Sequence, residues 1–584
     1  MSKAKFWRRS LPLIAIIGVT LIIMLPQMLM RSTIIGSDAI FHFNRFYDAA
    51  KQLQHLNFSY FQTNYGFQQS GRIINALYGP YFAYLNGILL MFVRSWHNFQ
   101  LLSTFMIYLI GGWGMYLLAR KVRADRPVAL SCALLFMNIG WMPRWGLSQN
   151  LNAWGAALAP FVLICSLRML TDQQNPVKIL PLALIMAVII EVHILSTLIF
   201  TAVLLPFFII GLVQTKQKLK MLRHTVAAAL LAVLLTANIW GSFLTIFANN
   251  SIAEPAQFDL EQHALQFSVL LGQRNQLGIV CLLLFSAQFL YVLFGRTSQV
   301  NRIVTWIGSI ILFISSDLFP WATLQHYLPV LQSLLQFPVR FTIIAYPLLL
   351  CGVALSATQL KLFTTARKSW VHPVAFSAVF LCLVPNVVGI YNKSAVYQSV
   401  DVLNSWTGVT VLADSPEQIR HSLRARHPGK LLRLVEKRHP DYLPIPDEFS
   451  KLNFHRSKEY EEQVIAIHHQ FDHQVLPGGR LRLSWFANTK TKRQLPLITY
   501  KESQLRLNGQ RLSRQQYRIT RIGAPIVTQQ PGRNHLILRF KQPALFTYLL
   551  VISLVSWALL ALLGMVKLID RCLNGNLSKR LIKH

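Results

Sequence analysis

The segment Tyr78–Val93, with the sequence YGPYFAYLNGILLMFV, decides the topology predicted for the whole chain. It is apolar, but Tyr78, Tyr81 and Tyr84 recur at helical spacing, which is typical of a helix that lies in the membrane interface. If this segment crossed the membrane, every later span would be inverted. The distribution of charge along the chain favours one of the two arrangements.

Composition places the chain among polytopic membrane proteins and excludes a soluble protein. Of its 584 residues, 53% are hydrophobic and 14% are charged, and the mean hydropathy is +0.40. The net charge of +35 does not indicate nucleic-acid binding, because membrane proteins gather Lys and Arg in cytoplasmic loops. We therefore expect membrane lipid, and no nucleic acid, as a partner.

Twelve apolar runs are near the length that crosses a bilayer or somewhat below it. They cover residues 11–30, 100–119, 128–142, 151–170, 178–191, 195–213, 226–247, 277–295, 303–317, 341–358, 372–390 and 544–567. The first run follows a basic N-terminus and has no small-residue cleavage pattern behind it, which favours a retained anchor.

The positive-inside bias keeps Tyr78–Val93 on the outer side of the membrane. In that arrangement the basic groups Arg120–Arg123 and Lys216–Arg223 lie inside, whereas the opposite loops hold mostly single basic residues such as Arg144 and Arg340. The sequence thus predicts a multi-pass protein of the cell (plasma) membrane, with cytoplasmic N- and C-termini.

Three regions follow from this topology. Residues 1–390 form the transmembrane body, with a long first extracytoplasmic loop over 31–99; residues 391–543 form an extracytoplasmic mixed domain; and residues 544–584 form the last helix and a cytoplasmic basic tail. Alternating apolar residues and Gly-containing turns predict a β-sandwich-like fold in the polar region, after a helix near 416–426. The predicted strands cover 463–467, 480–486, 504–507, 526–528 and 536–540.

The segment Gly36–Arg45, with the sequence GSDAIFHFNR, is the sharpest candidate for chemistry. Asp38, His42 and Arg45 are spaced four and three apart, so on a helix they share one face at the outer membrane surface. With Ser37 as N-cap, Asp38 would lie in the first turn. Asp38 could act as a base, or it could be an ordinary acid at a helix start. His42 could bind substrate or pack at the interface, and Arg45 could bind a phosphate or reach the head groups.

Further polar residues lie at the outer ends of the predicted spans. Because ionisable groups are costly at membrane depth, Glu191 and His193 are expected to face a cavity. Arg340 and Arg144 could hold a phosphate or anchor the interface, and Tyr78 begins the interfacial segment. The sequence contains no Walker loop, GxGxxG, HExxH or GxSxG motif, and no metal site is assigned.

Several short motifs resemble bacterial YfhO-like and 6-pyruvoyl-tetrahydropterin-synthase-related membrane proteins, which are similar to the GT-C class of polytopic glycosyltransferases. The motifs are Gly36-Ser37-Asp38, Tyr78-Gly79-Pro80, Ala157-Leu158-Ala159-Pro160, His193-Ile194-Leu195-Ser196 and Gln336-Phe337-Pro338-Val339-Arg340-Phe341. The resemblance covers about residues 10–390, and it implies a GT-C-like fold with about 12 transmembrane helices.

The resemblance also implies an activity, the transfer of a sugar from a polyprenyl-phosphate donor to an extracytoplasmic glycan or cell-wall polymer. Asp38 would be the catalytic base, and Arg340 would hold the donor phosphate. Some relatives use a second acid and a divalent cation such as Mg²⁺ or Mn²⁺; here the next acid is Asp48, about 80° round the helix from the Asp38 face. Two alternatives stay open, namely a non-catalytic transporter or assembly protein for lipid-linked sugars, and a β-domain that binds the polymer.

Overall fold

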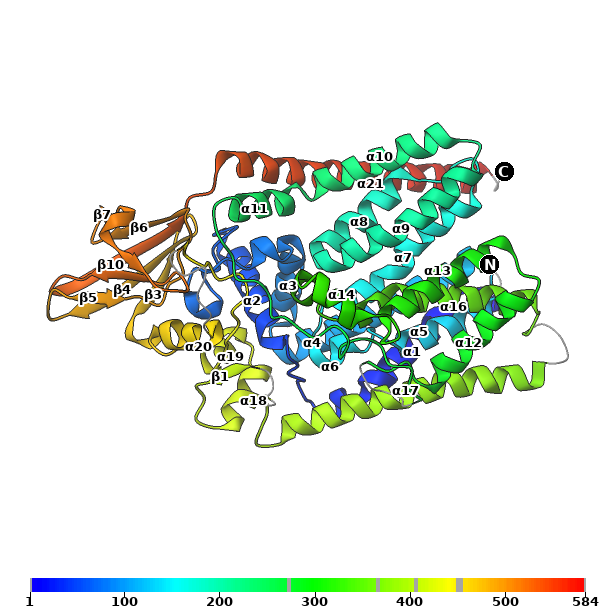
Figure 1. The fold of residues 1–584 in the computed structure, drawn as a ribbon, viewed down its shortest axis with the longest axis horizontal. Coiled ribbons are helices and arrows are strands. Elements are labelled where there is room, and N and C mark those ends of the chain that lie inside the picture. The colour runs from blue at the N-terminus through cyan, green and yellow to red at the C-terminus, as the bar shows by residue number, and fades with distance from the viewer. Residues whose placement is uncertain (1–2, 270–274, 364–367, 404–407, 448–454, 582–584) are drawn as a thin grey trace.

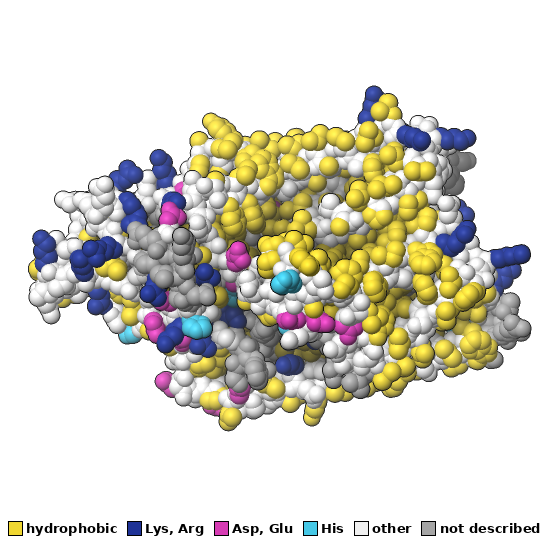
Figure 2. All heavy atoms as spheres, viewed as in Figure 1, with side chains coloured by type: hydrophobic (Ala, Val, Ile, Leu, Met, Phe, Trp, Pro, Cys, Tyr) yellow, Lys and Arg dark blue, Asp and Glu magenta, His cyan; other side chains and the backbone are white. Residues whose placement is uncertain are grey.

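The computed structural model describes residues 3–269, 275–363, 368–403, 408–447 and 455–581. A bundle of helices forms the body, and a β-rich region lies at one end of it, on the left in Figure 1. Both chain termini lie at the opposite end of the bundle. Hydrophobic side chains cover the flank of the bundle, and Lys and Arg gather towards its two ends, as Figure 2 shows. This distribution suits a protein whose flank faces lipid.

The helices follow the predicted apolar runs closely. Their bounds are α1 Lys3–Leu29, α2 Ala39–His55, α3 Pro80–Val93, α4 Trp96–Lys121, α5 Arg126–Met137, α6 Arg144–Ser148, α7 Asn152–Thr171, α8 Ile179–Val192, α9 Ile194–Gln214, α10 Lys218–Leu235, α11 Ala237–Phe247, α12 Ile279–Phe294, α13 Gln299–Ser315, α14 Trp321–Tyr327, α15 Val330–Leu334, α16 Thr342–Gln359, α17 Lys368–Gln398, α18 Pro416–Arg424, α19 Leu431–Leu434, α20 Arg456–Tyr460 and α21 Ala544–Leu581.

Within the described residues, 7 helices are long and apolar enough to cross a membrane, or 8 if α10 and α11, which meet at a bend of 64°, count as one span. The sequence predicted about twelve. The four other predicted spans correspond to α5, α8, α12 and α13, which are apolar helices of 10–17 residues. Runs of that length fall below the roughly 20 residues that a crossing needs, so composition alone overestimates the number of full-length spans.

The interfacial segment forms α3, which begins at Pro80 and has 14 residues. At 1.5 Å per residue this helix is about 21 Å long, shorter than the hydrocarbon core. Its N-cap, Gly79, has φ +78°, and a Cβ at this position would lie 1.7 Å from the carbonyl oxygen of Glu191. Only glycine allows so close an approach, which fixes the start of α3 against the end of α8.

The loop between α2 and α3 is ordered by an acid on α2. Asp48 is buried, and its Oδ1 accepts hydrogen bonds from the backbone N–H groups of Asn64 (3.0 Å) and Tyr65 (2.8 Å). Its Oδ2 accepts a hydrogen bond from Nε2 of Gln52 at 2.7 Å. Asp48 is therefore committed to the structure of the first loop.

The described part of the polar region contains three antiparallel sheets, the pair β1-β2 and two larger sheets that pack over a shared apolar core. One has the order β3-β4-β10-β6-β7 and the other β5-β9-β8, which agrees with the predicted β-rich region before the last helix. The predicted strand 463–467 is wrong, because Glu461–Ile465 is helical. The strands are β1 Val409–Val411, β2 Val435–Lys437, β3 Asp472–Leu476, β4 Arg480–Ala487, β5 Lys492–Gln494, β6 Ser503–Leu507, β7 Gln510–Arg511, β8 Arg518–Ile519, β9 Pro525–Thr528 and β10 Gly532–Phe540.

The β-rich region is joined to the first loop by hydrogen bonds. Asn57 Nδ2 donates to the carbonyl oxygen of Leu476 at 3.0 Å, and the backbone N–H of Ile73 donates to the hydroxyl of Tyr500 at 3.1 Å. The predicted first loop and the polar region thus lie at the same end of the helical body, where α2 begins (Figure 1).

Candidate functional site

Asp38 lies at the start of α2 and is half-buried. It is itself the N-cap, so the predicted cap at Ser37 is wrong by one position. Asn150 Nδ2 donates a hydrogen bond to Asp38 Oδ2 at 3.1 Å, and the backbone N–H of Asp38 donates to the carbonyl oxygen of Ser148 at 3.3 Å. The loop that follows α6 therefore orients this carboxylate.

His42 and Arg45 follow Asp38 on the same face of α2, as predicted, but both are buried. The guanidinium of Arg45 contacts Nδ1 of His42 at 3.1 Å and donates to Asn75 Oδ1 at 3.1 Å and to the carbonyl oxygen of Tyr78 at 2.5 Å. Its Cζ also lies 4.5 Å from the centre of the Tyr78 ring. Because these contacts occupy it inside the protein, Arg45 holds Tyr78 in place and does not face the lipid surface.

Tyr78 is affected by both Asp38 and Arg340, the proposed base and the proposed phosphate-binding residue. Burial raises the pKa of Tyr78 to about 12; Arg45 opposes this shift, Asp38 adds to it and Arg340 opposes it. Asp38 and Arg340 therefore both act electrostatically on one phenol, although about three hundred positions separate them in the chain.

Arg340 is buried in the turn that precedes α16. Its guanidinium donates to the carbonyl oxygen of Leu335 at 2.6 Å and to Gln336 Oε1 at 2.9 Å, and its Cζ lies 4.7 Å from the centre of the Phe337 ring. These contacts hold the guanidinium inside the protein, and the exposed fraction of Arg340 is 7%.

Glu191 and His193 lie at the junction of α8 and α9, as predicted. Glu191 accepts hydrogen bonds from Asn238 Nδ2 at 2.7 Å and from the backbone N–H of Tyr81 at 3.0 Å. Glu191 is buried and joins α8 to α11 and to the first turn of α3. His193 is half-buried and caps α9, where its Nδ1 lies 2.8 Å from the hydroxyl of Ser196.

Residues from the first loop, the α8–α9 junction and the polar region all affect the pKa of His42. Burial lowers the pKa of His42 well below its usual value, and the charges of Arg45, His439, His193 and Lys437 lower it further. The first loop, the α8–α9 junction and the polar region therefore meet around one imidazole, which is neutral at physiological pH.

Arg144 lies beside a cavity of its own in the helical body. It begins the five-residue helix α6 and lines a separate cavity of about 80 Å³ with Asn138 and Asn386. The C-cap residue of α6, Gln149, accepts a hydrogen bond from the backbone N–H of Gly36 at 2.8 Å. Helix α6 therefore connects Arg144 to Gln149, which binds the backbone two positions before Asp38.

The polar region supplies three residues that the sequence analysis missed. Lys437 Nζ donates to the carbonyl oxygen of Ser37 at 2.9 Å, and the ring of His439 lies 4.6 Å from that of Phe41. His439 Nε2 lies 3.6 Å from Asp441 Oδ2. The only signal in the sequence is the run Lys437-Arg438-His439-Pro440-Asp441, which is also typical of an exposed loop.

Asp441 is an acid whose titration is shifted towards neutral pH. Burial raises the pKa of Asp441 to about 7; Arg72 opposes this shift, Asp38 adds to it and Lys437 opposes it. The buried guanidinium of Arg72 holds this segment in place by hydrogen bonds to the carbonyl oxygens of His439 and Asp441. A carboxyl that is partly protonated at neutral pH can accept or donate a proton.

The described residues do not fit a metal centre. No group of three or more His, Cys, Asp or Glu side chains among them is arranged to hold a metal ion. Asp48, the second acid of the first loop, is engaged by backbone N–H groups. We therefore assign no role in the reaction to a divalent cation.

Apolar helices that are long enough to span a bilayer, with a charged cluster where they meet a β-rich region, define a multi-pass membrane protein. A family model described as "6-pyruvoyl-tetrahydropterin synthase related domain; membrane protein" matches residues 76–395, and the chain belongs to this family. No curated protein matches the chain.

Two solved structures resemble the chain distantly. The oligosaccharyltransferase of Archaeoglobus fulgidus in its apo form has 14% sequence identity and a TM-score of 0.37, over 67% of this chain and 56% of that one. Its complex with zinc and sulfate gives the same identity and TM-score over 65% and 53% of the two chains. The chain thus spans little more than half the length of that protein.

Proposed function

We propose that this protein is an inverting membrane glycosyltransferase of GT-C type, which transfers a sugar from a polyprenyl-phosphate donor to an extracytoplasmic glycan or polymer. One observation carries the proposal: Asp38, half-buried at the end of the helical body, has Lys437 and Asp441 of the polar region beside it. A carboxylate among cations at the membrane edge suits a reaction in which a hydroxyl loses a proton and a lipid phosphate leaves.

In the proposed reaction, Asp38 takes the proton from an acceptor hydroxyl. The hydroxyl oxygen forms a bond to the anomeric carbon, and the bond from that carbon to the phosphate oxygen breaks, so the configuration inverts. Lys437 and Arg340 stabilise the charge on the departing polyprenyl phosphate. Asn150 orients Asp38 through its 3.1 Å hydrogen bond. We assign His42, Arg45, Tyr78, Glu191 and His193 as positioning residues, because their polar contacts hold the first loop and the α8–α9 junction in place.

The proposed orientation places the β-rich region outside the cell and both termini inside. Lys and Arg side chains gather where the termini lie, on the right of Figure 2. The positive-inside bias assigns such an end to the cytoplasm. The short helices α5, α8, α12 and α13 would complete the twelve spans of the proposed GT-C fold, with neighbouring helices packed around them.

A large cavity offers a place for the acceptor. It has a volume of about 630 Å³ and lies between the segment after α11 and the β-rich region. Tyr517 and Arg514 line it, and so does Pro444, three positions after Asp441. A cavity that begins so close to the proposed site supports the view that the β-rich region binds the acceptor as well as completing the site.

The alternative function, a transporter or assembly protein, requires polar side chains along a path through the membrane. One polar group in the body lies on α12, α13 and α16, where Gln288 donates to Asn301 at 3.0 Å and Asn301 donates to Ser356 at 2.8 Å. These side chains satisfy one another, as structural polar contacts between membrane helices do. The charged candidates instead gather at one end, which favours an enzyme.

The proposal is tested with the purified full-length chain in lipid nanodiscs and a polyprenyl-phosphate sugar. We expect release of polyprenyl phosphate that depends on an added glycan acceptor. Movement of the intact donor across vesicles, without cleavage of its sugar–phosphate bond, would instead establish the transporter.

A further inference from the structure

A second polar cluster lies at the opposite end of the helical body from Asp38. Helix α7 has 20 residues, from Asn152, close to the Asn150 that binds Asp38, to Thr171. A helix of that length spans about 30 Å, the thickness of the hydrocarbon core, so its two ends reach opposite membrane surfaces. A cavity of about 220 Å³ opens beside the far end of α7, against the end of α4 and the start of α8.

The cavity joins apolar walls to a cationic rim. Ile164, Met169 and Leu182 are among the residues that form its walls. Three of its nine described lining residues are cations, Lys121, Arg168 and Lys178, and none of the nine is acidic. Asp172 forms an ion pair with Arg168, and the two lysines leave an excess of positive charge at the rim.

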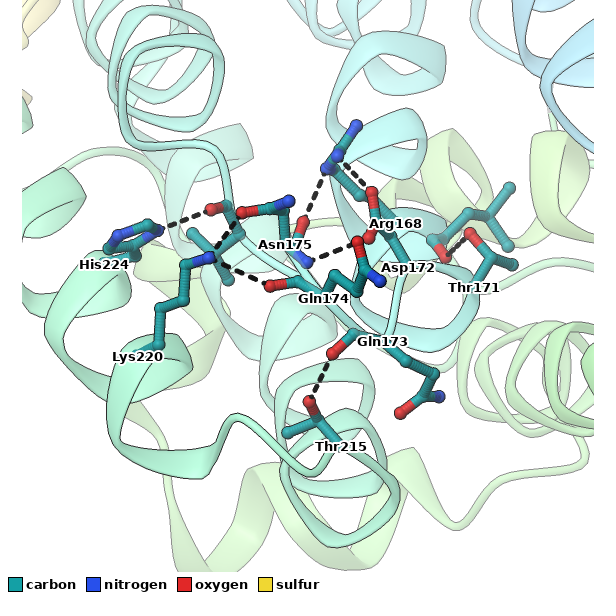
Figure 3. Close-up of polar contacts among 11 residues, drawn as sticks. Arg168, Thr171, Asp172, Gln173, Gln174, Asn175, Thr215, Lys220 and His224 are labelled. Carbon is teal, nitrogen blue, oxygen red and sulfur yellow. Dashed lines mark hydrogen bonds and ion pairs between the residues drawn. The ribbon is translucent and has the colours of Figure 1, made fainter.

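The loop over residues 172–178, which carries Lys178, is held by the hydrogen bonds that Figure 3 shows. Arg168 Nε donates to the carbonyl oxygen of Asn175 at 2.8 Å, and Lys220 Nζ donates to Asn175 Oδ1 at 2.7 Å. His224 and Thr215 bind two further carbonyl oxygens of the loop, those of Val177 and Gln173. Contacts from α7, from α10 and from Thr215 after α9 therefore fix the loop, and with it the position of Lys178.

We infer that this cavity binds the head group of an anionic phospholipid, with its phosphate at Lys121, Lys178 and Arg168 and the start of an acyl chain along the apolar wall. Charge complementarity supplies the head-group preference. The apolar walls, at the end of membrane-spanning helices, select a lipid over a free phosphate ion. This site is independent of the proposed transferase site, because the whole length of α7 separates the two.

The test measures lipid binding to the purified full-length protein in detergent by native mass spectrometry, with phosphatidylglycerol and phosphatidylcholine as probes. We expect the double variant Lys121→Gln, Lys178→Gln to bind phosphatidylglycerol about tenfold or more weakly than the unaltered protein, with phosphatidylcholine binding unchanged. The charge-conserving variant Lys121→Arg, Lys178→Arg should keep most of the binding, which separates loss of charge from misfolding.

The matched control is Lys216→Gln, Lys218→Gln, which removes the same charge from exposed positions outside the cavity. We expect this control to bind phosphatidylglycerol as the unaltered protein does. An equal loss in the control would overturn the inference in favour of diffuse surface charge. Equal binding of phosphatidylcholine, or full competition by inorganic phosphate, would overturn it as well, since the first shows no head-group preference and the second needs no lipid.

Discussion

Lys437 Nζ donates a hydrogen bond to the carbonyl oxygen of Ser37 at 2.9 Å, across 400 positions of the chain. This bond places a cation of the polar region next to Asp38, the N-cap of α2. Lys437 is buried, so the bond forms where water competes weakly. The β-rich region is thus a structural part of the candidate site.

Replacing Lys437 should weaken both the contact and the site. We expect Lys437→Met to lower kcat/KM for sugar transfer by about tenfold to hundredfold, because a hydrogen bond from a charged donor is worth about 1.5–3 kcal/mol. Lys430→Gln, at an exposed position of the same region, is the control and should leave transfer unchanged. Unaltered transfer by Lys437→Met would remove this residue from the site.

Asp48 should matter for stability rather than for chemistry. We expect Asp48→Ala to lower the free energy of unfolding by about 2 kcal/mol or more, because two buried backbone N–H groups lose their acceptor. Asp48→Asn keeps one side-chain oxygen as an acceptor for these N–H groups, so it should lower the free energy of unfolding by less. Thermal unfolding in detergent measures both, and a variant as stable as the unaltered protein would contradict this role.

The raised pKa of Asp441, about 7, predicts a pH dependence of stability. Between its usual value of 3.8 and about 7, the folded protein holds a proton on this carboxyl that the unfolded chain has lost. Its contribution to stability is therefore full at low pH and declines as the pH rises through that range. Arg72, Asp38, Lys437 and His439 face the carboxyl and set this balance.

Asp441→Asn removes this titration. We expect a smaller decline of the unfolding midpoint between about pH 4 and pH 7 than in the unaltered protein. Asp48 and Glu436, whose pKa values burial raises to about 6 and about 8, should keep part of the decline in both proteins. An identical slope in the variant would show that Asp441 does not hold the proton.

The proposed orientation predicts the accessibility of single cysteines. Ser513→Cys, exposed in the β-rich region, should react with a membrane-impermeant maleimide on intact cells. Lys218→Cys, exposed at the other end, should react only after the cells are opened. The reverse pattern would place the β-rich region in the cytoplasm and would make Tyr78–Val93 a crossing segment.

The local sequence pattern predicted most helices and strands, but it did not predict which of them pack together. The strand over 480–486 alternates apolar and polar residues between two turns, and β4 covers Arg480–Ala487. The run 463–467 is also apolar in part, but its buried residues Val464 and Ile465 belong to a helix. Short apolar runs suit either structure, and tertiary packing selects one of them.

The candidate site shows the same division. Helical spacing was enough to place Asp38, His42 and Arg45 on one face, because that relation is local. The burial of Arg45 against Tyr78 depends on how distant segments pack, and so does the position of Lys437 and Asp441 beside the start of α2. No periodicity in the sequence carries that information.

The central claim, that Asp38 is the catalytic base, is tested most directly by the rate of sugar transfer from a polyprenyl-phosphate donor with purified Asp38→Asn. Asp317→Asn, an exposed acid outside the cluster, serves as the matched control. We predict that Asp38→Asn lowers kcat by about 10²- to 10⁴-fold, the usual contribution of a positioned base, while donor binding and the unfolding midpoint stay near those of the control. Full transfer by Asp38→Asn would contradict the account.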